Sequence, residues 1–149
     1  MQLARRRDTL RLGRAIAALL RPGELVVLTG DLGTGKTFLA RAIARGLGLP
    51  PGERVTSPTF TLVSEHETPR GTLLHVDLYR LREERDPEGE VRQLGLGERR
   101  AEGAIVVAEW AEGLLAPLGG DPALTVHLSH AGDHGRTADL GGPRAGELG

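Results

Sequence analysis

The only lysine of this chain, Lys36, lies in a glycine-rich segment whose residue types and spacing suit phosphate chemistry. The segment Gly-Asp-Leu-Gly-Thr-Gly-Lys-Thr, residues 30–37, matches the pattern G-x-x-x-x-G-K-[ST] in full, and every other basic residue is an arginine. In a loop of this kind, backbone N–H groups surround a polyphosphate, and a slim ammonium reaches the terminal phosphates where a planar guanidinium does not fit. The segment therefore predicts a polyphosphate-binding loop around Lys36.

The elements on either side of this loop have the character needed to position it. Residues 24–29 form a short apolar run after Pro22-Gly23, which is typical of a buried strand. Residues 37–47 carry apolar side chains at helical spacing, and the pattern stops at Gly48. A strand, a glycine loop and a helix in this order direct the free amides of a helix N-terminus toward an anion.

A polyphosphate in such a loop is normally bound together with Mg²⁺, for which Thr37 would supply one hydroxyl ligand. A carboxylate at the end of a neighbouring strand usually adds a second ligand, and Asp77 and Glu109 each stand near the end of a predicted strand. Ligands of an open sheet collect at the carboxyl ends of its strands, so both acids are expected to face one crevice. Lys36, Asp77 and Glu109 are the candidate catalytic residues. One acid would serve the metal and the other would orient a water molecule, and the sequence leaves the division of roles open.

Three further features near these residues each have a functional and a structural interpretation. Ser57 and Thr59 lie in a hydroxyl-rich segment that would form a switch-like loop sensing the terminal phosphate, or a simple turn into a strand. His75 shares a strand face with Asp77, so it would hold that acid, or it is a half-buried strand histidine without chemistry. Trp110 would stack on a nucleobase or fill the core.

The remaining pattern favours one domain over residues 1–149, in the α/β class. It predicts a three-layer domain with a mostly parallel sheet plus an antiparallel hairpin, because strands alternate with helices. The terminal residues 1–7 and 141–149 are expected to fray. The other predicted elements are an amphipathic helix over residues 8–20 with Asp8 as its N-cap, hairpin strands at 59–65 and 72–79, short helical pieces within 82–97, and strands at 103–109, 123–129 and 136–140.

Composition excludes several classes of function. The 149 residues include 19 basic and 20 acidic side chains with a net charge of −1, so the chain lacks the bulk charge of a nucleic-acid-binding protein. Without cysteine it has no disulfide, zinc–thiolate site or catalytic thiol. The three arginines at 5–7 are expected to be a solvated end. No long apolar run is present, which predicts a cytoplasmic protein that does not contact a membrane.

Because the chain has only one lysine, it has no room for the N-K-x-D element of guanine-specific GTPases, and the expected base is adenine. Four segments then occur in the order and spacing of one family: Gly-Asp-Leu-Gly-Thr-Gly-Lys-Thr at 30–37, Thr-Ser-Pro-Thr-Phe-Thr-Leu-Val at 56–63, His-Val-Asp-Leu-Tyr-Arg-Leu at 75–81 and Glu-Trp at 109–110. In these segments the chain resembles the TsaE family of small bacterial P-loop ATPases.

This resemblance implies an Mg²⁺-dependent subunit that binds ATP as its substrate and hydrolyses it, weakly when alone. Such a subunit is needed for the threonylcarbamoyl modification of adenosine in tRNA. It would act with the partner proteins TsaD and TsaB and support turnover of their complex, while direct contact with tRNA stays open.

The resemblance also assigns roles to single residues. It implies that Thr37 and Glu109 bind Mg²⁺, that Asp77 is a Walker B-like acid at the metal, and that Thr59 belongs to the switch-like loop. The residues that it places at the nucleotide are Thr9, Gly33, Thr34, Gly35, Lys36, Thr37, Phe38, Trp110 and Arg136.

Two other functions fit the same loop. A small-molecule kinase would use an arginine-rich lid, for which residues 82–100 are a candidate. A non-catalytic module would use bound nucleotide only to set its affinity for a partner. In a subunit of the tRNA-modifying assembly, the pair Arg99 and Arg100 would contribute to a partner or tRNA surface, or it is a solvated surface pair.

Overall fold

The computed structural model describes residues 1–53 and 62–148, so the predicted switch-like residues Ser57 and Thr59 lie outside the described residues. The strands of the described chain are β1 (Gln2–Leu3), β2 (Leu25–Thr29), β3 (Val63–Thr68), β4 (Gly71–Asp77), β5 (Ile105–Glu109), β6 (Leu124–Ala131) and β7 (Gly135–Gly141). The α-helices are α1 (Arg6–Leu19), α2 (Lys36–Gly46), α3 (Pro87–Gln93) and α4 (Leu96–Ala101), and the 3₁₀ helices are η1 (Tyr79–Glu83), η2 (Ala116–Leu118) and η3 (Ala145–Leu148).

The strands form one mixed sheet in the order β1-β7-β6-β2-β5-β4-β3. The four central strands β6, β2, β5 and β4 are parallel, and the strands outside them pair in antiparallel fashion. The predicted fold class and the β3–β4 hairpin are thereby confirmed. Parallel pairing brings the carboxyl ends of β2, β4 and β5 to the same edge of the sheet, which is the edge where the glycine loop begins.

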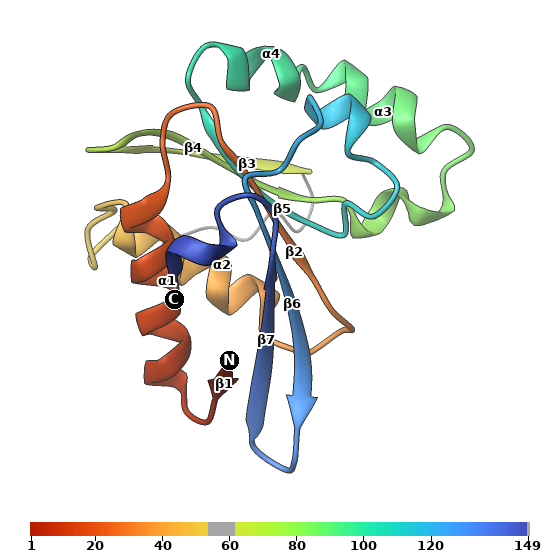
Figure 1. Cartoon of the computed structure of the whole chain (residues 1–149). Helices are drawn as coiled ribbons and strands as arrows, with labels where there is room; N and C mark the ends of the chain where they lie inside the picture. The colour runs from red at the N-terminus through yellow and green to blue at the C-terminus, as the bar shows by residue number, and fades with distance from the viewer. Residues whose placement is uncertain (54–61, 149) are drawn as a thin grey trace.

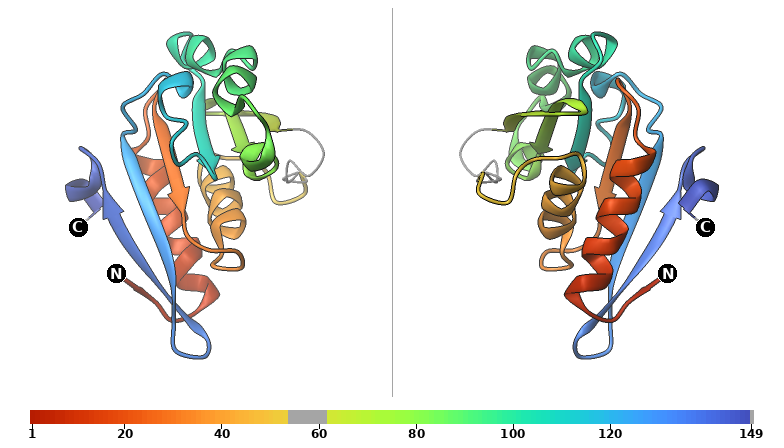
Figure 2. Two further views of the ribbon diagram at one scale, coloured as in Figure 1. Left: turned by 90° about the vertical axis from the view of Figure 1, so that its right-hand side faces the viewer. Right: turned by 90° about the vertical axis from the view of Figure 1, so that its left-hand side faces the viewer.

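Two hydrophobic cores cover the two faces of the sheet. Successive strand residues point to opposite faces, so Val26 and Leu28 pack under α1 and α2 while Leu25 and Val27 pack against the side that carries α3 and α4. Figures 1 and 2 show these helices on opposite sides of the sheet. A sheet buried on both faces explains why β2 is a continuous apolar run without alternation.

Helices α1 and α2 approach each other unusually closely because glycine occupies both contact points. A Cβ atom placed on Gly13 would lie 2.4 Å from Cβ of Ala42, and one placed on Gly46 would lie 2.6 Å from Cβ of Ala17. This packing brings the first turns of the two helices together. It thereby brings Thr9 of α1 close to the glycine loop that precedes α2.

The chain ends differ from the expectation that they fray. Leu3 is 3% exposed because β1 pairs with β7 at the edge of the sheet, and Ala138 of β7 donates a backbone hydrogen bond to Met1. After β7 the chain continues into η3, and both ends lie on the β7 side of the molecule (Figure 2). Backbone pairing and burial of Leu3 order an N-terminus that its arginines alone suggest is solvated.

Two local predictions are also corrected. Helix α1 begins at Arg6, so Asp8 is not the N-cap but the third helical residue, and its carboxylate accepts the N–H of Arg5. Arg100 is not a solvated surface cation, because its guanidinium donates to the carbonyls of Gly23, Leu118 and Gly120.

Among the described residues, none of the helices has both the length and the apolar character that a membrane span requires.

Candidate functional site

The glycine loop between β2 and α2 curls around the side chain of Lys36. Gly33 and Gly35 have φ angles of 78° and 100°, in the left-handed region that favours glycine. Lys36 begins α2, and its ammonium donates hydrogen bonds to the carbonyls of Gly30 and, at 2.9 Å, Asp31. The predicted strand, loop and helix are therefore present, and the first amides of α2 lie at the loop.

Lys36 is 5% exposed, and its electrostatic surroundings pull in two directions. Burial lowers the pKa of the ammonium, and nearby carboxylates, Glu109 foremost, oppose this shift. The ring of Trp110 covers the ammonium, with its centroid 4.1 Å from Nζ. Carbonyls, carboxylates and an aromatic face together hold a cation beside the loop.

The two candidate acids stand side by side at the carboxyl edge of the sheet. Asp77 ends β4, Glu109 ends β5, and the two residues are register partners. The hydroxyl of Thr37 donates to Glu109, with Oγ1 2.9 Å from Oε1 and 3.2 Å from Oε2. The expectation that both acids share one crevice is met, and Glu109 is the one in contact with Thr37.

His75 contacts Glu109 rather than Asp77, so the expectation that it holds Asp77 is wrong. Its Nε2 lies 2.6 Å from Oε2 of Glu109, and each residue is 2% exposed. Asp77 is half-buried, and its Oδ1 accepts the N–H of Tyr79 at 3.0 Å. Burial raises the pKa of Asp77, and the neighbouring charge of Glu109 adds to the shift.

Trp110 belongs to the site and does not merely fill the core. Its φ angle of 59° is rare for a bulky residue and turns the chain directly after Glu109. Tyr79 meets its ring edge-on at 4.9 Å between centroids, and the guanidinium of Arg82 lies 3.5 Å from the centroid of Tyr79. Neither Tyr79 nor Arg82 was predicted as a site residue. The motif at 75–81 contains Tyr79 and was the available signal for it, whereas Arg82 lies one residue beyond that motif.

Two cavities flank the glycine loop and share Gly35 and Phe38. The acidic cavity, of about 370 Å³, is lined by Leu32, Gly33, Gly35, Lys36, Thr37, Phe38, Asp77, Tyr79, Glu109 and Trp110. The arginine cavity, of about 260 Å³, is lined by Leu3, Arg5, Arg6, Thr9, Thr34, Gly35, Phe38, Leu128, His134 and Arg136. The residues predicted at the nucleotide are thus divided between two adjoining spaces.

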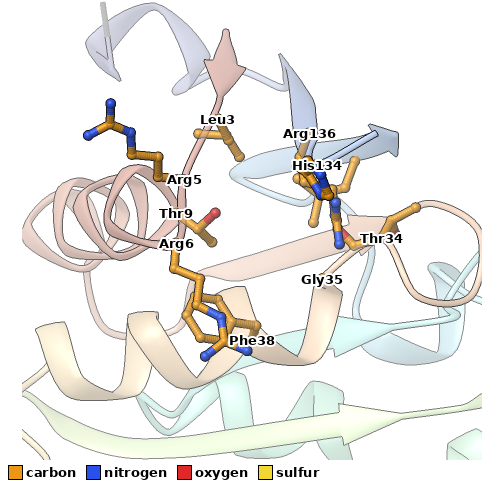
Figure 3. A pocket seen from close by; sticks show the side chains of 10 residues that line it. Leu3, Arg5, Arg6, Thr9, Thr34, Gly35, Phe38, His134 and Arg136 are labelled. Atoms are coloured by element: carbon orange, nitrogen blue, oxygen red, sulfur yellow. The ribbon is translucent and has the colours of Figure 1, made fainter. Parts of the chain in front are cut away.

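The arginine cavity is shown in Figure 3. Arg136 of β7 donates from Nε to the carbonyl of Thr34 at 3.1 Å, so this arginine braces the glycine loop. The guanidinium of Arg6 lies 5.5 Å from the centroid of the Phe38 ring, whereas the side chain of Arg5 extends away from that ring (Figure 3). Arg6 is exposed, as the expectation of a solvated arginine run states, and it also lines this cavity. His134 was missed, because no motif marks it and only the turn between β6 and β7 brings it here.

The donor set of the acidic cavity suits a hard cation in combination with an anionic ligand. Thr37 and Glu109 offer neighbouring oxygen atoms. Among the described residues, this cavity included, no group of three or more histidine, cysteine, aspartate or glutamate side chains could hold a metal ion. A cation bound by Thr37 and Glu109 would therefore need further oxygens from a ligand and from water, which is how Mg²⁺ is held in phosphate sites.

Fold and site together define an α/β protein whose glycine loop joins a central parallel strand to a helix, with two acids at the ends of adjacent strands. The family model described as threonylcarbamoyl adenosine biosynthesis protein TsaE matches residues 3–138. The tRNA threonylcarbamoyladenosine biosynthesis protein TsaE of Aquifex aeolicus is 41% identical over 105 residues, which are 70% of this chain and 71% of that protein. The protein of the same name from Rickettsia bellii is 37% identical over 133 residues, 89% of this chain and 88% of that one.

A solved structure shares the fold of this chain. The crystal structure of Bacillus subtilis YdiB matches with a TM-score of 0.72 and 28% sequence identity, over 99% of this chain and 88% of that chain. The chain belongs to the TsaE family.

Proposed function

We propose that this protein is an Mg²⁺-dependent ATP-binding and ATP-hydrolysing subunit required for the threonylcarbamoyl modification of adenosine in tRNA. The observation that carries the proposal is the contact between Thr37 and Glu109 beside the buried ammonium of Lys36, in a chain of the TsaE family. Relatives named for tRNA threonylcarbamoyladenosine biosynthesis supply the pathway. We further propose TsaD and TsaB as partner proteins whose complex turns over with the help of this hydrolysis.

The nucleotide would use both cavities. The terminal phosphates lie in the acidic cavity, where the loop amides and the Lys36 ammonium neutralise their charge. The adenosine end lies in the arginine cavity near Thr9, with Phe38 at the boundary between the two spaces. Arg136 keeps the loop in its curled form through the carbonyl of Thr34.

Thr37 and Glu109 would hold the magnesium ion, which supplies positive charge to the phosphate oxygens when bound. Asp77 has a different task. Its Oδ1 is engaged by the N–H of Tyr79, so Oδ2 is the oxygen that accepts a proton from an attacking water. Catalysis then consists of positioning and charge stabilisation, and a partner that completes the site would accelerate a slow isolated subunit.

The variant Lys36→Ala tests the proposal most directly. It should weaken Mg·ATP binding in calorimetry about a hundredfold or more, because a buried charge-assisted contact with the phosphates is lost. When the complete set of proteins is reconstituted with this variant, threonylcarbamoyl modification of tRNA should fall as well. Arg92→Ala removes an exposed cation of α3 and is the matched control. Unchanged ATP affinity and tRNA modification in Lys36→Ala would contradict the proposal.

The other two functions differ in what the same assays would record. A kinase would form ADP only when an acceptor is present, and residues 82–100 give no support for a lid, since Val91 and Leu96 are buried in the core of the sheet. A non-catalytic module would keep tRNA modification active in Asp77→Asn and Glu109→Gln. The proposed ATPase loses modification in both variants.

A further inference from the structure

We infer that His75 is a positioning residue that fixes the carboxylate of Glu109 in the orientation in which it serves Thr37 and the cation. This inference rests on the proposed function, since it concerns the metal-binding step. It gives a task to a buried histidine that the proposed chemistry does not otherwise use.

The geometry forms a continuous chain of contacts from the loop into the sheet. Thr37 Oγ1 lies 2.9 Å from Glu109 Oε1, and Glu109 Oε2 lies 2.6 Å from Nε2 of His75. His75 is the register partner of Val107 on the neighbouring strand β5. Glu109 lies two residues after Val107, so the side chains of His75, Val107 and Glu109 point to the same face of the sheet. That face packs against α2, whose first turn carries Thr37.

The hydrogen-bonding requirement of the two groups assigns their roles. An ionised carboxylate only accepts hydrogen bonds, so the imidazole must donate Nε2–H to it. Among the described residues, Nδ1 of His75 is buried without a partner, which makes Glu109 the one polar contact that the structure gives this ring. Burying an imidazole for packing alone is costly, because an apolar side chain would fill the same space without an unpaired nitrogen. The contact with Glu109 explains why a histidine stands there.

The contact also has a consequence for the metal. A free glutamate side chain samples several rotamers, whereas one whose Oε2 is tied to a strand neighbour presents Oε1 toward Thr37 in one geometry. Groups that orient a metal ligand in this way typically change metal affinity 10–100-fold when they are removed. His75 would therefore act on the Mg²⁺-dependent part of nucleotide binding and leave the phosphate contacts of the loop unaffected.

Two amide substitutions at His75 separate the effect of its hydrogen-bond donor from the effect of its side-chain volume. Gln carries its amide nitrogen about as far from the backbone as Nε2, so His75→Gln keeps a donor for Glu109. Asn ends where Nδ1 would be, so His75→Asn loses that donor. His66, another buried strand histidine, lies on β3, and His66→Asn is the control for burying the same amide elsewhere in the sheet. His75→Leu adds an apolar variant in case an amide disturbs folding.

The measurement is nucleotide affinity by calorimetry, once with excess Mg²⁺ and once with EDTA, together with Mn²⁺ binding followed by electron paramagnetic resonance. We expect His75→Asn and His75→Leu to lose about tenfold in the Mg²⁺-dependent gain in affinity and in Mn²⁺ binding. Affinity in EDTA should stay within about twofold, and His75→Gln should retain most of the gain. Adding His75→Asn to Glu109→Gln should cost little more, because both act on one contact.

The outcomes separate this inference from the proposed function. If the wild-type protein binds no Mg·ATP, both fail. If the wild-type protein shows the Mg²⁺-dependent gain and His75→Asn keeps it, the inference is wrong even when that variant melts at a lower temperature, since the histidine is then merely structural. Equal losses in His75→Gln and His75→Asn would likewise overturn it, because the donor would not matter.

Discussion

The two cavities beside the glycine loop differ in how the chain builds them. The acidic cavity draws its acids from the ends of β4 and β5, two adjacent parallel strands in the middle of the sheet. The arginine cavity draws its residues from β1, the start of α1 and the β6–β7 hairpin, which meet only at the edge of the sheet. The two candidate acids thus lie on interior strands that have a neighbour on both sides, whereas the arginine cavity lies toward the β1–β7 edge of the sheet.

This contrast predicts different responses to substitution. Substitutions in the acidic cavity should alter the metal-dependent reaction and leave the β1–β7 edge of the sheet folded, because the acids of this cavity lie on the interior strands β4 and β5. Changes at the sheet edge should alter stability and overall affinity together. Each of the following variants either sharpens this division or breaks it.

The largest effect is expected for Glu109→Gln. Loss of the carboxylate removes a candidate metal ligand, so Mg²⁺-dependent ATP hydrolysis should fall about a hundredfold or more, while nucleotide affinity in EDTA should change little. Glu90→Gln, which removes an exposed acid of α3, is the control. A fall in EDTA affinity as large as the fall in hydrolysis would show that Glu109 shapes the whole loop.

Leu3→Ala should be next in size, and it acts through the edge. Removing a side chain that is 3% exposed should lower the free energy of unfolding by about 2–3 kcal/mol, measured by urea denaturation. Leu10→Ala, at 37% exposure on α1, should cost much less. If both substitutions cost the same, the N-terminal strand does not hold the arginine cavity together.

Arg136→Ala should produce an intermediate loss of affinity. Without the bond to the Thr34 carbonyl the loop loses its brace, and nucleotide affinity should fall about tenfold, or about 1.4 kcal/mol. The loss should be equal with Mg²⁺ and with EDTA, because the arginine lies on the other side of the loop from the candidate metal ligands. Arg85→Ala, an exposed arginine between η1 and α3, serves as the control.

The smallest effect is a pH-dependent change in stability for Asp77→Asn. Because burial raises the pKa of Asp77 in the folded protein, ionising this carboxyl costs folding free energy. This loss of folding free energy is absent below the ordinary aspartate pKa of about 3.9, where Asp77 is protonated in both the folded and the unfolded protein. It grows as the pH rises from there through the raised pKa that Asp77 has in the folded protein. Asp77→Asn should therefore gain at most about 1 kcal/mol at neutral pH, since water partly screens the half-exposed group, and nothing in acid. Thermal melts across pH measure this, and a loss at neutral pH would contradict it.

The central part of the fold and the acidic cavity were predictable because each rests on short-range patterns. The apolar run before the loop, the helical spacing after it and the strand-end rule place Lys36, Thr37 and Glu109 together without knowledge of strand order. Strand alternation also placed His75 and Asp77 on one face. It does not say which neighbour lies across from them, and so His75 was paired with the wrong acid.

The arginine cavity resisted prediction for a different reason. Its assembly depends on the pairing of β1 with β7, between residues at opposite ends of the sequence. No local pattern marks a two-residue strand, and an arginine run beside it resembles a solvated terminus. Arg136 and Thr9 entered only through resemblance to a family, and the structure then placed both of them at the cavity.

Because Lys36 is the only lysine, the folded chain offers acylating reagents one ε-amine, and that amine sits under an indole ring inside the loop. A single mass increment on the tryptic peptide that contains it would report whether the loop is open or filled. Protection by nucleotide could thus be titrated in whole-cell extracts without any label on the protein.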